Sequence, residues 1–270
     1  MRLNMLSPTP DPRMPQLSGT ALKLGLRSLS LAVFALGWEL LALRLDSLLL
    51  PTFTETIAAL AELIATRQLW EALWISNQAM VLGFFLACFV GIPLGLLIGR
   101  GRAVERYVDP YLSVLLATPK SALMPIVIMA AGLGLVSRVL VTFTHAIVVI
   151  TVTVRAGLRT IDPALIEMAQ SFGATERQLW RKVFLRGALP AVLTGLRLGV
   201  ARAISGMISV ELLLVAVGIG RLILNFQGTF DAAGLYATVS VVVAEALLLL
   251  QVVRWLDRRM APWRFESEVR

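Results

Sequence analysis

Residues 79–99 read AMVLGFFLACFVGIPLGLLIG, a stretch of 21 residues without a charged side chain. About 20 apolar residues cross the hydrocarbon core of a bilayer as an α-helix. In lipid, only helices and closed barrels satisfy all their own backbone hydrogen bonds. The stretch therefore predicts a membrane-spanning helix and an all-α integral membrane protein. Small residues recur at every fourth position within it, which is typical of a helix that packs closely on another: Gly83, Ala87, Gly91 and Gly95.

Five further apolar stretches have the composition of membrane spans. They are Ser28–Leu43, Tyr111–Leu135, Val139–Val154, a stretch from after Leu193 to about Val217, and Ala232–Val253. Glu39 interrupts the first stretch, and Pro119 and Pro125 interrupt the second. The stretch between Arg138 and Arg155 is short for a span, so its helix is expected to extend past these arginines. The sequence thus predicts six transmembrane helices within residues 28–257.

The composition agrees with lipid as the solvent for much of the chain. Of the 270 residues, 57% are hydrophobic and 16% are charged, whereas soluble proteins carry about 25% charged residues. The net charge of +8 does not indicate nucleic-acid binding, because the charges cluster in short segments between the apolar runs. We therefore expect contact with membrane lipid and none with nucleic acid.

The residues that usually carry catalysis are scarce. Cys88 is the one cysteine and His145 the one histidine, and both lie within apolar runs. A disulfide within the chain, a cysteine-based metal site and a Ser-His-Asp or Cys-His catalytic group are therefore excluded. His145 is expected to be a hydrogen-bonded structural residue. Because the phosphate-loop motif G-x-x-x-x-G-K-[ST] is also absent, we expect neither enzyme activity nor a cofactor or metal bound to this chain.

The distribution of positive charge predicts the orientation in the membrane. With both termini in the cytoplasm, the cytoplasmic segments hold 18 Lys and Arg residues and the external loops hold 4. Cytoplasmic loops of membrane proteins carry the excess of these residues, so both termini are predicted to be cytoplasmic. Residues 1–27 hold several prolines and are predicted to form a flexible cytoplasmic arm, and residues 258–270 a cytoplasmic tail.

The external loop between the first two spans is predicted to contain a short amphipathic helix. Glu55 and Glu62 alternate there with apolar residues at helical spacing, including Ile57, Leu60 and Ile64. A helix of this pattern lies in the plane of the membrane interface.

The cytoplasmic stretch from Arg155 to Leu193 is predicted to begin with a short helix. Asp162 followed by Pro163 is typical of a helix start, because aspartate accepts the first free amides and proline suits the first helical position. The helix is expected to run from Pro163 to Phe172. It should end at Gly173, since glycine adopts the left-handed conformation of a helix cap.

A second helix start follows at Thr175, which has Gln178 in capping-box spacing. This helix is expected to end at Arg186–Gly187, before Pro190. Its apolar residues lie on one side: Leu179, Trp180, Val183 and Phe184. Periodicity alone suits a groove on a partner protein and a position on the inner leaflet equally well.

Within this stretch, Glu167, Ala169 and Gly173 resemble the Glu-Ala-Ala, three residues, Gly signature of permease subunits of binding-protein-dependent ABC importers. Met168 stands in place of the first alanine of the signature, and Val183 where the family has isoleucine. The run is similar to the branch that imports nitrate, sulfonates, taurine, bicarbonate and related solutes. Further motifs in the family's order extend the resemblance over about Leu50 to Arg264: Gly91-Ile-Pro-Leu-Gly95, Thr118-Pro-Lys-Ser-Ala-Leu-Met-Pro125, Val210-Glu211 with Gly218-Ile-Gly220, and Asp257-Arg-Arg259.

The resemblance implies a type I ABC importer permease fold in the bacterial cytoplasmic (inner) membrane, with a small solute crossing by alternating access. The solute would be a nitrate-, sulfonate- or taurine-like anion or a small heterocycle. The implied partners are two copies of a cytoplasmic ABC ATPase, which binds ATP and Mg²⁺, a second permease copy forming a homodimer, and an external substrate-binding protein. The residues implied to couple to the ATPase are Glu167, Ala169, Gly173, Thr175, Leu179, Trp180 and Val183.

Three ionisable residues at membrane depth are candidates for the translocation path, because such residues usually face protein or water: Lys120, Glu211 and Glu245. For the two glutamates, pairing between helices with Arg197, Arg202 or Lys120 is the preferred interpretation. For Lys120, contact with an anionic substrate and a capping role stay equally open. A rival function is a secondary transporter driven by an ion gradient, with Glu211 or Glu245 carrying the proton.

Overall fold

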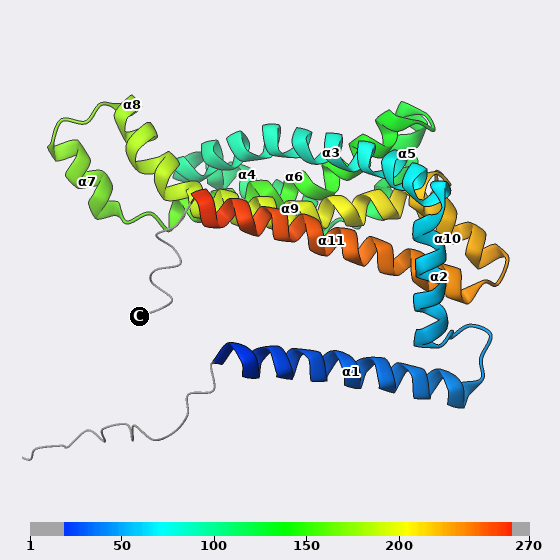
Figure 1. Ribbon diagram of the computed structural model, residues 1–270. Helices are drawn as coiled ribbons and strands as arrows, with labels where there is room; N and C mark the ends of the chain where they lie inside the picture. Colours follow the sequence, from blue (N-terminus) through cyan, green and yellow to red (C-terminus); the bar gives the residue numbers. More distant parts are fainter. Residues whose placement is uncertain (1–18, 261–270) are drawn as a thin grey trace, which may run out of the picture.

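The computed structural model describes residues 19–260 of the chain, and the regular elements there are all helical (Figure 1). In chain order they are α1 (Gly19–Leu45), α2 (Phe53–Ala65), α3 (Arg67–Arg100), α4 (Arg102–Ala117), α5 (Lys120–Ala131), α6 (Leu135–Arg159), α7 (Pro163–Ser171), α8 (Glu176–Leu179), η1 (Trp180–Phe184), α9 (Leu185–Leu213), α10 (Gly218–Gly228) and α11 (Ala232–Met260). The element η1 is a single turn of π-helix.

Five helical segments of this region are long and apolar enough to cross a membrane, and the predicted number of six is reached if one bent helix pair counts as a span. Five are continuous: most of α1, then α3, α6, the run Glu176–Leu213, and α11. The sixth is the pair α4 and α5, which passes the same test only when taken together. As predicted, α6 extends past Arg138 and Arg155 at its ends.

The predicted third span over Tyr111–Leu135 is broken, as its prolines indicated, because α4 and α5 meet at an angle of 94°. The break falls at Thr118 and Pro119, whose backbones are both extended. Proline disfavours the helical conformation for the residue before it and lacks an amide hydrogen. Pro125, by contrast, stays inside α5.

The predicted end of the second cytoplasmic helix at Arg186–Gly187 was also wrong. Helix α8 passes through η1 directly into α9, so one helical run extends from Glu176 to Leu213. Pro190 lies inside α9. In the π-turn at Trp180–Phe184, the Leu185 amide donates to the Trp180 carbonyl five residues back, so the helical run continues without a gap.

The N-terminal helix starts earlier than hydropathy indicated. Helix α1 begins at Gly19, within the segment 1–27 that was predicted to be a flexible arm. A helix continues past charged residues once it leaves the hydrocarbon, where hydropathy gives no signal. Residues 1–18 and 261–270, which include most of the predicted tail, lie outside the described residues.

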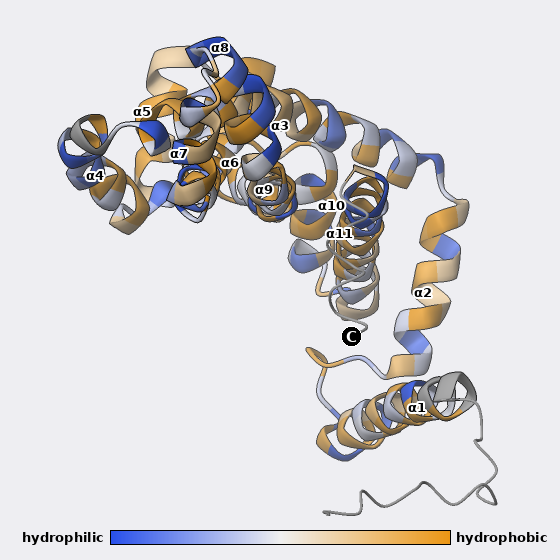
Figure 2. Ribbon diagram, turned by 90° about the vertical axis from the view of Figure 1, so that its left-hand side faces the viewer, coloured by the Kyte–Doolittle hydropathy of each residue, from blue (hydrophilic) through white to orange (hydrophobic). Residues whose placement is uncertain are grey.

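The predicted amphipathic helix is present as α2, which joins α1 to the bundle. Thr52 and Glu55 form a capping box at its start, with hydrogen bonds of 2.8 and 3.1 Å. The amide of Thr52 lowers the pKa of the Glu55 carboxyl below its ordinary value. Glu39 of α1 accepts hydrogen bonds from the amide and hydroxyl of Thr54, so the two helices are tied at this corner. Figure 2 shows α1 standing apart from the rest of the bundle.

The core of the bundle is the packing of α3, α6 and α9. The predicted small-residue face of α3 lies against α6, where Gly83, Ala87, Gly91 and Gly95 are buried. A Cβ atom at Gly95 would lie 2.7 Å from the carbonyl oxygen of Thr151. This spacing shows that the two helix backbones touch, which holds helices together in lipid through van der Waals contact.

We predict that Gly95→Ala destabilises the protein by about 1–3 kcal/mol, because the added methyl group meets backbone that cannot move away. Gly37→Ala is the matched control, since nothing lies within 4 Å of a Cβ atom at Gly37 in α1. The melting temperature of the purified protein measures both changes. Equal melting temperatures for the two variants would contradict the close contact between α3 and α6.

Candidate functional site

The helix pair α7–α8 projects from one end of the bundle (Figure 1). Asp162 caps α7 as predicted, its carboxylate accepting a hydrogen bond of 2.9 Å from the amide of Ala164. Gly173 has a φ of 73°, and its amide donates to the Gln170 carbonyl at 2.9 Å. Residues other than glycine pay about 1–2 kcal/mol in this left-handed conformation. The sequence therefore predicted both ends of α7 correctly.

No residue of α7 is buried, and of its larger apolar side chains only Ile166 is partly covered. Leu165 and Met168 are about half exposed, and the Phe172 side chain after the helix is 85% exposed. Glu167 is exposed as well, and Ala169 is partly buried. Sequence reasoning did not name Leu165 or Phe172 as contact residues. Their spacing with Met168, at intervals of three and four, was the available signal.

The apolar residues of the second helix hold the segment to the rest of the chain. Leu179 is buried, with 3% of its surface exposed, and Trp180 and Val183 are partly buried. Leu179 is thus covered by the chain itself, and its predicted role in coupling to the ATPase stays a prediction. Thr175 forms the predicted capping box with Gln178.

Arg100, the last residue of α3, anchors the start of the second helix. Its guanidinium forms an ion pair with Glu176 and lies 5.1 Å from the ring centroid of Trp180. The Trp180 ring in turn contacts the tilted Phe184 ring, with the ring centroids 5.5 Å apart. An ion pair combined with a cation–π contact fixes the position of a side chain better than either contact alone.

A second charged network lies beside it between α4 and α6. Glu105 accepts hydrogen bonds from Arg155 at 2.7 Å and from Arg159 at 2.5 Å. Arg155 also pairs with Asp109, one turn further along α4. These contacts join the first part of the broken span to the end of α6 from which the projecting pair departs.

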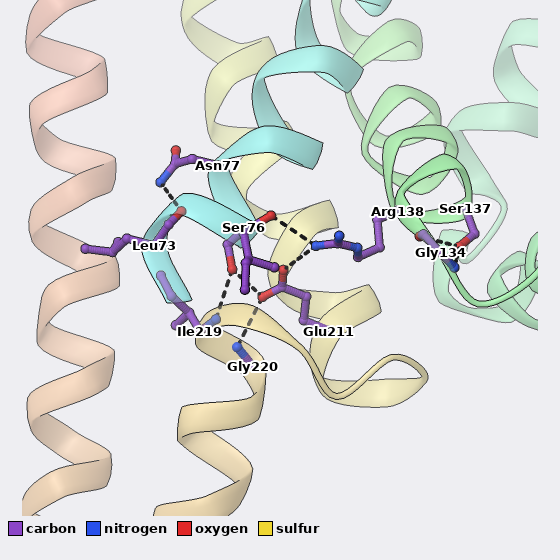
Figure 3. Close-up of polar contacts among 10 residues, drawn as sticks. Leu73, Ser76, Asn77, Gly134, Ser137, Arg138, Glu211, Ile219 and Gly220 are labelled. Carbon is purple, nitrogen blue, oxygen red and sulfur yellow. Dashed lines mark hydrogen bonds and ion pairs between the residues drawn. The ribbon is translucent and has the colours of Figure 1, made fainter. Parts of the chain in front are cut away.

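The buried carboxylate of Glu211, at the other end of α9, joins four helices (Figure 3). The Ser76 hydroxyl of α3 donates to it at 2.7 Å, and the Gly220 amide of α10 at 3.1 Å. Arg138 of α6 lies 3.4 Å from the carboxylate and also donates to the Ile75 carbonyl at 3.1 Å. Glu211 is fully buried, and Arg138 nearly so.

Two glycines of α10 make this arrangement possible. A Cβ atom at Gly218 would collide with the Ser76 hydroxyl, and one at Gly220 would collide with Glu211. Gly218 also has a φ of 57°. The Ser76 hydroxyl oxygen accepts a hydrogen bond of 2.9 Å from the Ile219 amide, so the start of α10 is bound to α3 as well.

The structure separates the three predicted path residues. Pairing of Glu211 between helices is confirmed, but its partner is Arg138 and not Arg197, Arg202 or Lys120. The ion-pair partner of Glu211 depends on which helix faces meet. The spacing of residues along the sequence does not reveal this. Arg197 pairs instead with Asp257 of α11 at 3.0 Å.

Glu245 and Lys120 lie elsewhere. Glu245 lies beside Asn77 in an apolar groove of about 680 Å³ between α2, α3 and α11. Lys120 is the first residue of α5, immediately after the break in the third span. Neither glutamate is within ion-pair distance of Lys120 in the described part of the chain.

A bundle of membrane-spanning helices with a projecting helix pair at one end is the architecture of a transport permease. The chain belongs to the family of binding-protein-dependent transport system inner membrane components, which it matches over residues 91–262. It is thus a multi-pass membrane protein and the permease subunit of an ABC importer. This membership confirms the predicted family and rules out the secondary transporter considered as a rival.

Two similar relatives are permeases for sulfur-containing solutes. The chain is 31% identical to the taurine transport system permease protein TauC of Escherichia coli (strain K12), over 74% of this chain and 73% of the relative. It is 30% identical to the putative aliphatic sulfonates transport permease protein SsuC of Bacillus subtilis (strain 168), over 81% of this chain and 79% of the relative.

A solved structure shares the fold. A chain of the MetNI methionine ABC transporter in an inward-facing conformation superposes with a TM-score of 0.63 and 19% sequence identity. The match covers 69% of this chain and 93% of the MetNI chain. The predicted type I ABC importer permease fold is therefore confirmed.

We predict that Arg138→Met lowers the free energy of unfolding by about 3–5 kcal/mol, because it leaves the Glu211 carboxylate buried without its charge partner. Combining Arg138→Met with Glu211→Gln should cost less than Arg138→Met alone, since both charges are then gone. Thermal unfolding of the purified proteins measures the difference.

The exposed ion pair between Arg67 and Glu71 provides the control. Arg67→Ala should change stability by less than about 0.5 kcal/mol, as expected for a solvated pair on one helix. If the double variant unfolded at the temperature of Arg138→Met, the two charges would not stabilise each other.

Proposed function

We propose that this permease imports a small solute carrying an oxyanion group by alternating access, and that a separate cytoplasmic ATPase drives it through α7. The observation that carries the proposal is the exposed surface formed by Leu165, Met168 and Phe172 on a helix that touches little else in the chain. Apolar side chains at these intervals on a short helix suit a groove on a partner protein.

The inner-leaflet alternative is less well supported. Helices that lie on a membrane surface carry basic side chains beside the apolar face, where they meet anionic head groups. Helix α7 contains no Lys or Arg and carries Glu167. The basic residues of this region are on the second helix, whose apolar face is turned into the bundle. A protein partner is thus favoured for α7.

The proposed mechanism uses the continuous helical run from Glu176 to Leu213. ATP closes two copies of the ATPase, the docked α7 moves with them, and the run transmits the displacement into the membrane. A second copy of this permease completes the pore, and an external binding protein delivers the solute. Sulfonate transport by two relatives supports an oxyanion as cargo.

The proposed orientation places both termini and α7 in the cytoplasm of a bacterial cell. We predict that Gln170→Cys, in a Cys88→Ser background, reacts with a membrane-impermeant maleimide only in inverted membrane vesicles. Ser47→Cys, in the exposed α1–α2 connection, should react in intact cells. The reverse labelling pattern would overturn the orientation.

Docking through α7 predicts that Phe172→Ala weakens association with the ATPase more than about tenfold, because buried aromatic residues dominate interface energies. Co-purification of the ATPase with tagged permease from membranes measures the effect. Phe230→Ala is the matched control, since Phe230 is also an exposed phenylalanine and lies in the connection before α11. Equal losses for the two variants would show that α7 is not the docking helix.

A further inference from the structure

Two cationic side chains and a histidine from different helices lie within electrostatic range of one another at membrane depth. Lys120 begins α5, His145 lies near the middle of α6, and Arg202 lies near the middle of α9. The positive charge of Arg202 acts on both Lys120 and His145, and that of Lys120 acts on His145. The contact between α6 and α9 is close here, because a Cβ atom at Gly206 would lie 2.9 Å from Cγ of His145.

This basic cluster has no counter-charge. Within residues 19–260, neither Lys120 nor Arg202 forms an ion pair or a side-chain hydrogen bond. Every other arginine described above at membrane depth has a carboxylate partner, as Arg138 has Glu211 and Arg197 has Asp257. Unpaired cations at this depth are costly unless they face water or an anion.

The broken span adds a further positive element at the same place. Helix α5 starts at Lys120 after the 94° bend, and Pro119 before it provides no side-chain cap. The first amides of an uncapped helix carry free N–H groups and the positive end of the helix dipole. In discontinuous membrane helices, such N-termini point at the anionic groups of substrates.

The cluster is also accessible from outside the chain. Arg202 is exposed, and Lys120 and His145 are partly exposed. Apolar residues of α5 on the outside of the chain, such as Met129, are exposed too. Because exposed cations are unfavourable against lipid tails, this face must border water or a second protein copy.

We propose that Lys120 and Arg202, together with the N-terminus of α5, form an oxyanion-binding subsite beside His145 on the translocation path. Arg202 supplies a planar fork and Lys120 a point charge for a sulfonate or comparable group. The Nδ1–H of His145 donates to the Val141 carbonyl at 2.9 Å, so Nε2 of the neutral ring is an acceptor and the two cations, not His145, bind the anion. Placement on the path rests on the proposed function, whereas anion binding does not.

Thermal denaturation of the full-length permease in nanodiscs of zwitterionic lipid tests the binding directly. The probe is sodium ethanesulfonate in Tris-gluconate buffer, and dimethyl sulfone is the neutral comparison. A ligand that binds only the folded state raises its melting temperature by mass action. Ethanesulfonate, but not dimethyl sulfone, should stabilise the natural protein. Lys120→Gln and Arg202→Gln should each weaken this response roughly tenfold or more in apparent affinity.

Without ethanesulfonate, the two variants report on the cluster in a second way. Each should melt above the natural protein, because one of two repelling charges is gone. If either residue had a purely structural role, its replacement would lower the melting temperature. Lys120→Arg should keep the response, and so should Arg221→Gln, which removes an exposed cation from α10.

The proposal is overturned if ethanesulfonate stabilises Lys120→Gln and Arg202→Gln as it does the natural protein, or stabilises none of them. It is also overturned if either variant melts below the natural protein. The measurement contains no ATPase, so a negative result leaves docking through α7 untouched. A failure of the Phe172 experiment likewise leaves anion binding untouched.

Discussion

Lipid tails are as apolar as the side chains they surround, so burial of apolar area does not bring helices together within a bilayer. The bundle depends instead on the direct contact between α3 and α6, where glycines such as Gly83 and Gly95 let the backbones touch. At one end of this contact, the Glu211 carboxylate adds bonds from α3, α6 and α10. Helix packing along the length of the bundle and the buried Glu211 carboxylate at one end together make α3, α6 and α9 one core. Helix α1 attaches to this core mainly through α2.

The sequence predicted the features whose causes are local along the chain. The bilayer demands apolar runs of a set length, so the positions of the long apolar helices were predictable from the sequence. Helix caps depend on residues within a few positions, so the ends of α7 at Asp162 and Gly173 were readable too. The partner of Glu211 was not, because Arg138 is 73 residues away and meets it only through helix packing. The same limit applies to the cluster around Lys120, which three separate helices assemble.

Pro119 coincides with a break between two helices, whereas other prolines lie inside unbroken helices. Pro119 separates α4 from α5, whereas Pro93 and Pro190 lie inside α3 and α9. Both intact helices belong to the core, where neighbouring helices hold the backbone in place and re-satisfy the freed groups. The broken pair packs less extensively, with α4 mostly exposed. Packing is not the whole cause, because Pro110 lies inside the mostly exposed α4 without breaking it, so the presence of proline alone does not decide where a membrane helix breaks.

The continuous run from Glu176 to Leu213 places three functional elements on one rigid body. Arg100 and the buried Leu179 hold its first turn, Arg202 lies near its middle, and Glu211 is bonded to three other helices near its far end. On the proposed mechanism, a displacement of α7 would be passed to this run, which follows it in the chain. Arg202 would then shift relative to Lys120, which lies on a different helix. The same displacement that follows the nucleotide cycle would therefore change the spacing of the two cations, and with it the affinity for an anion held between them.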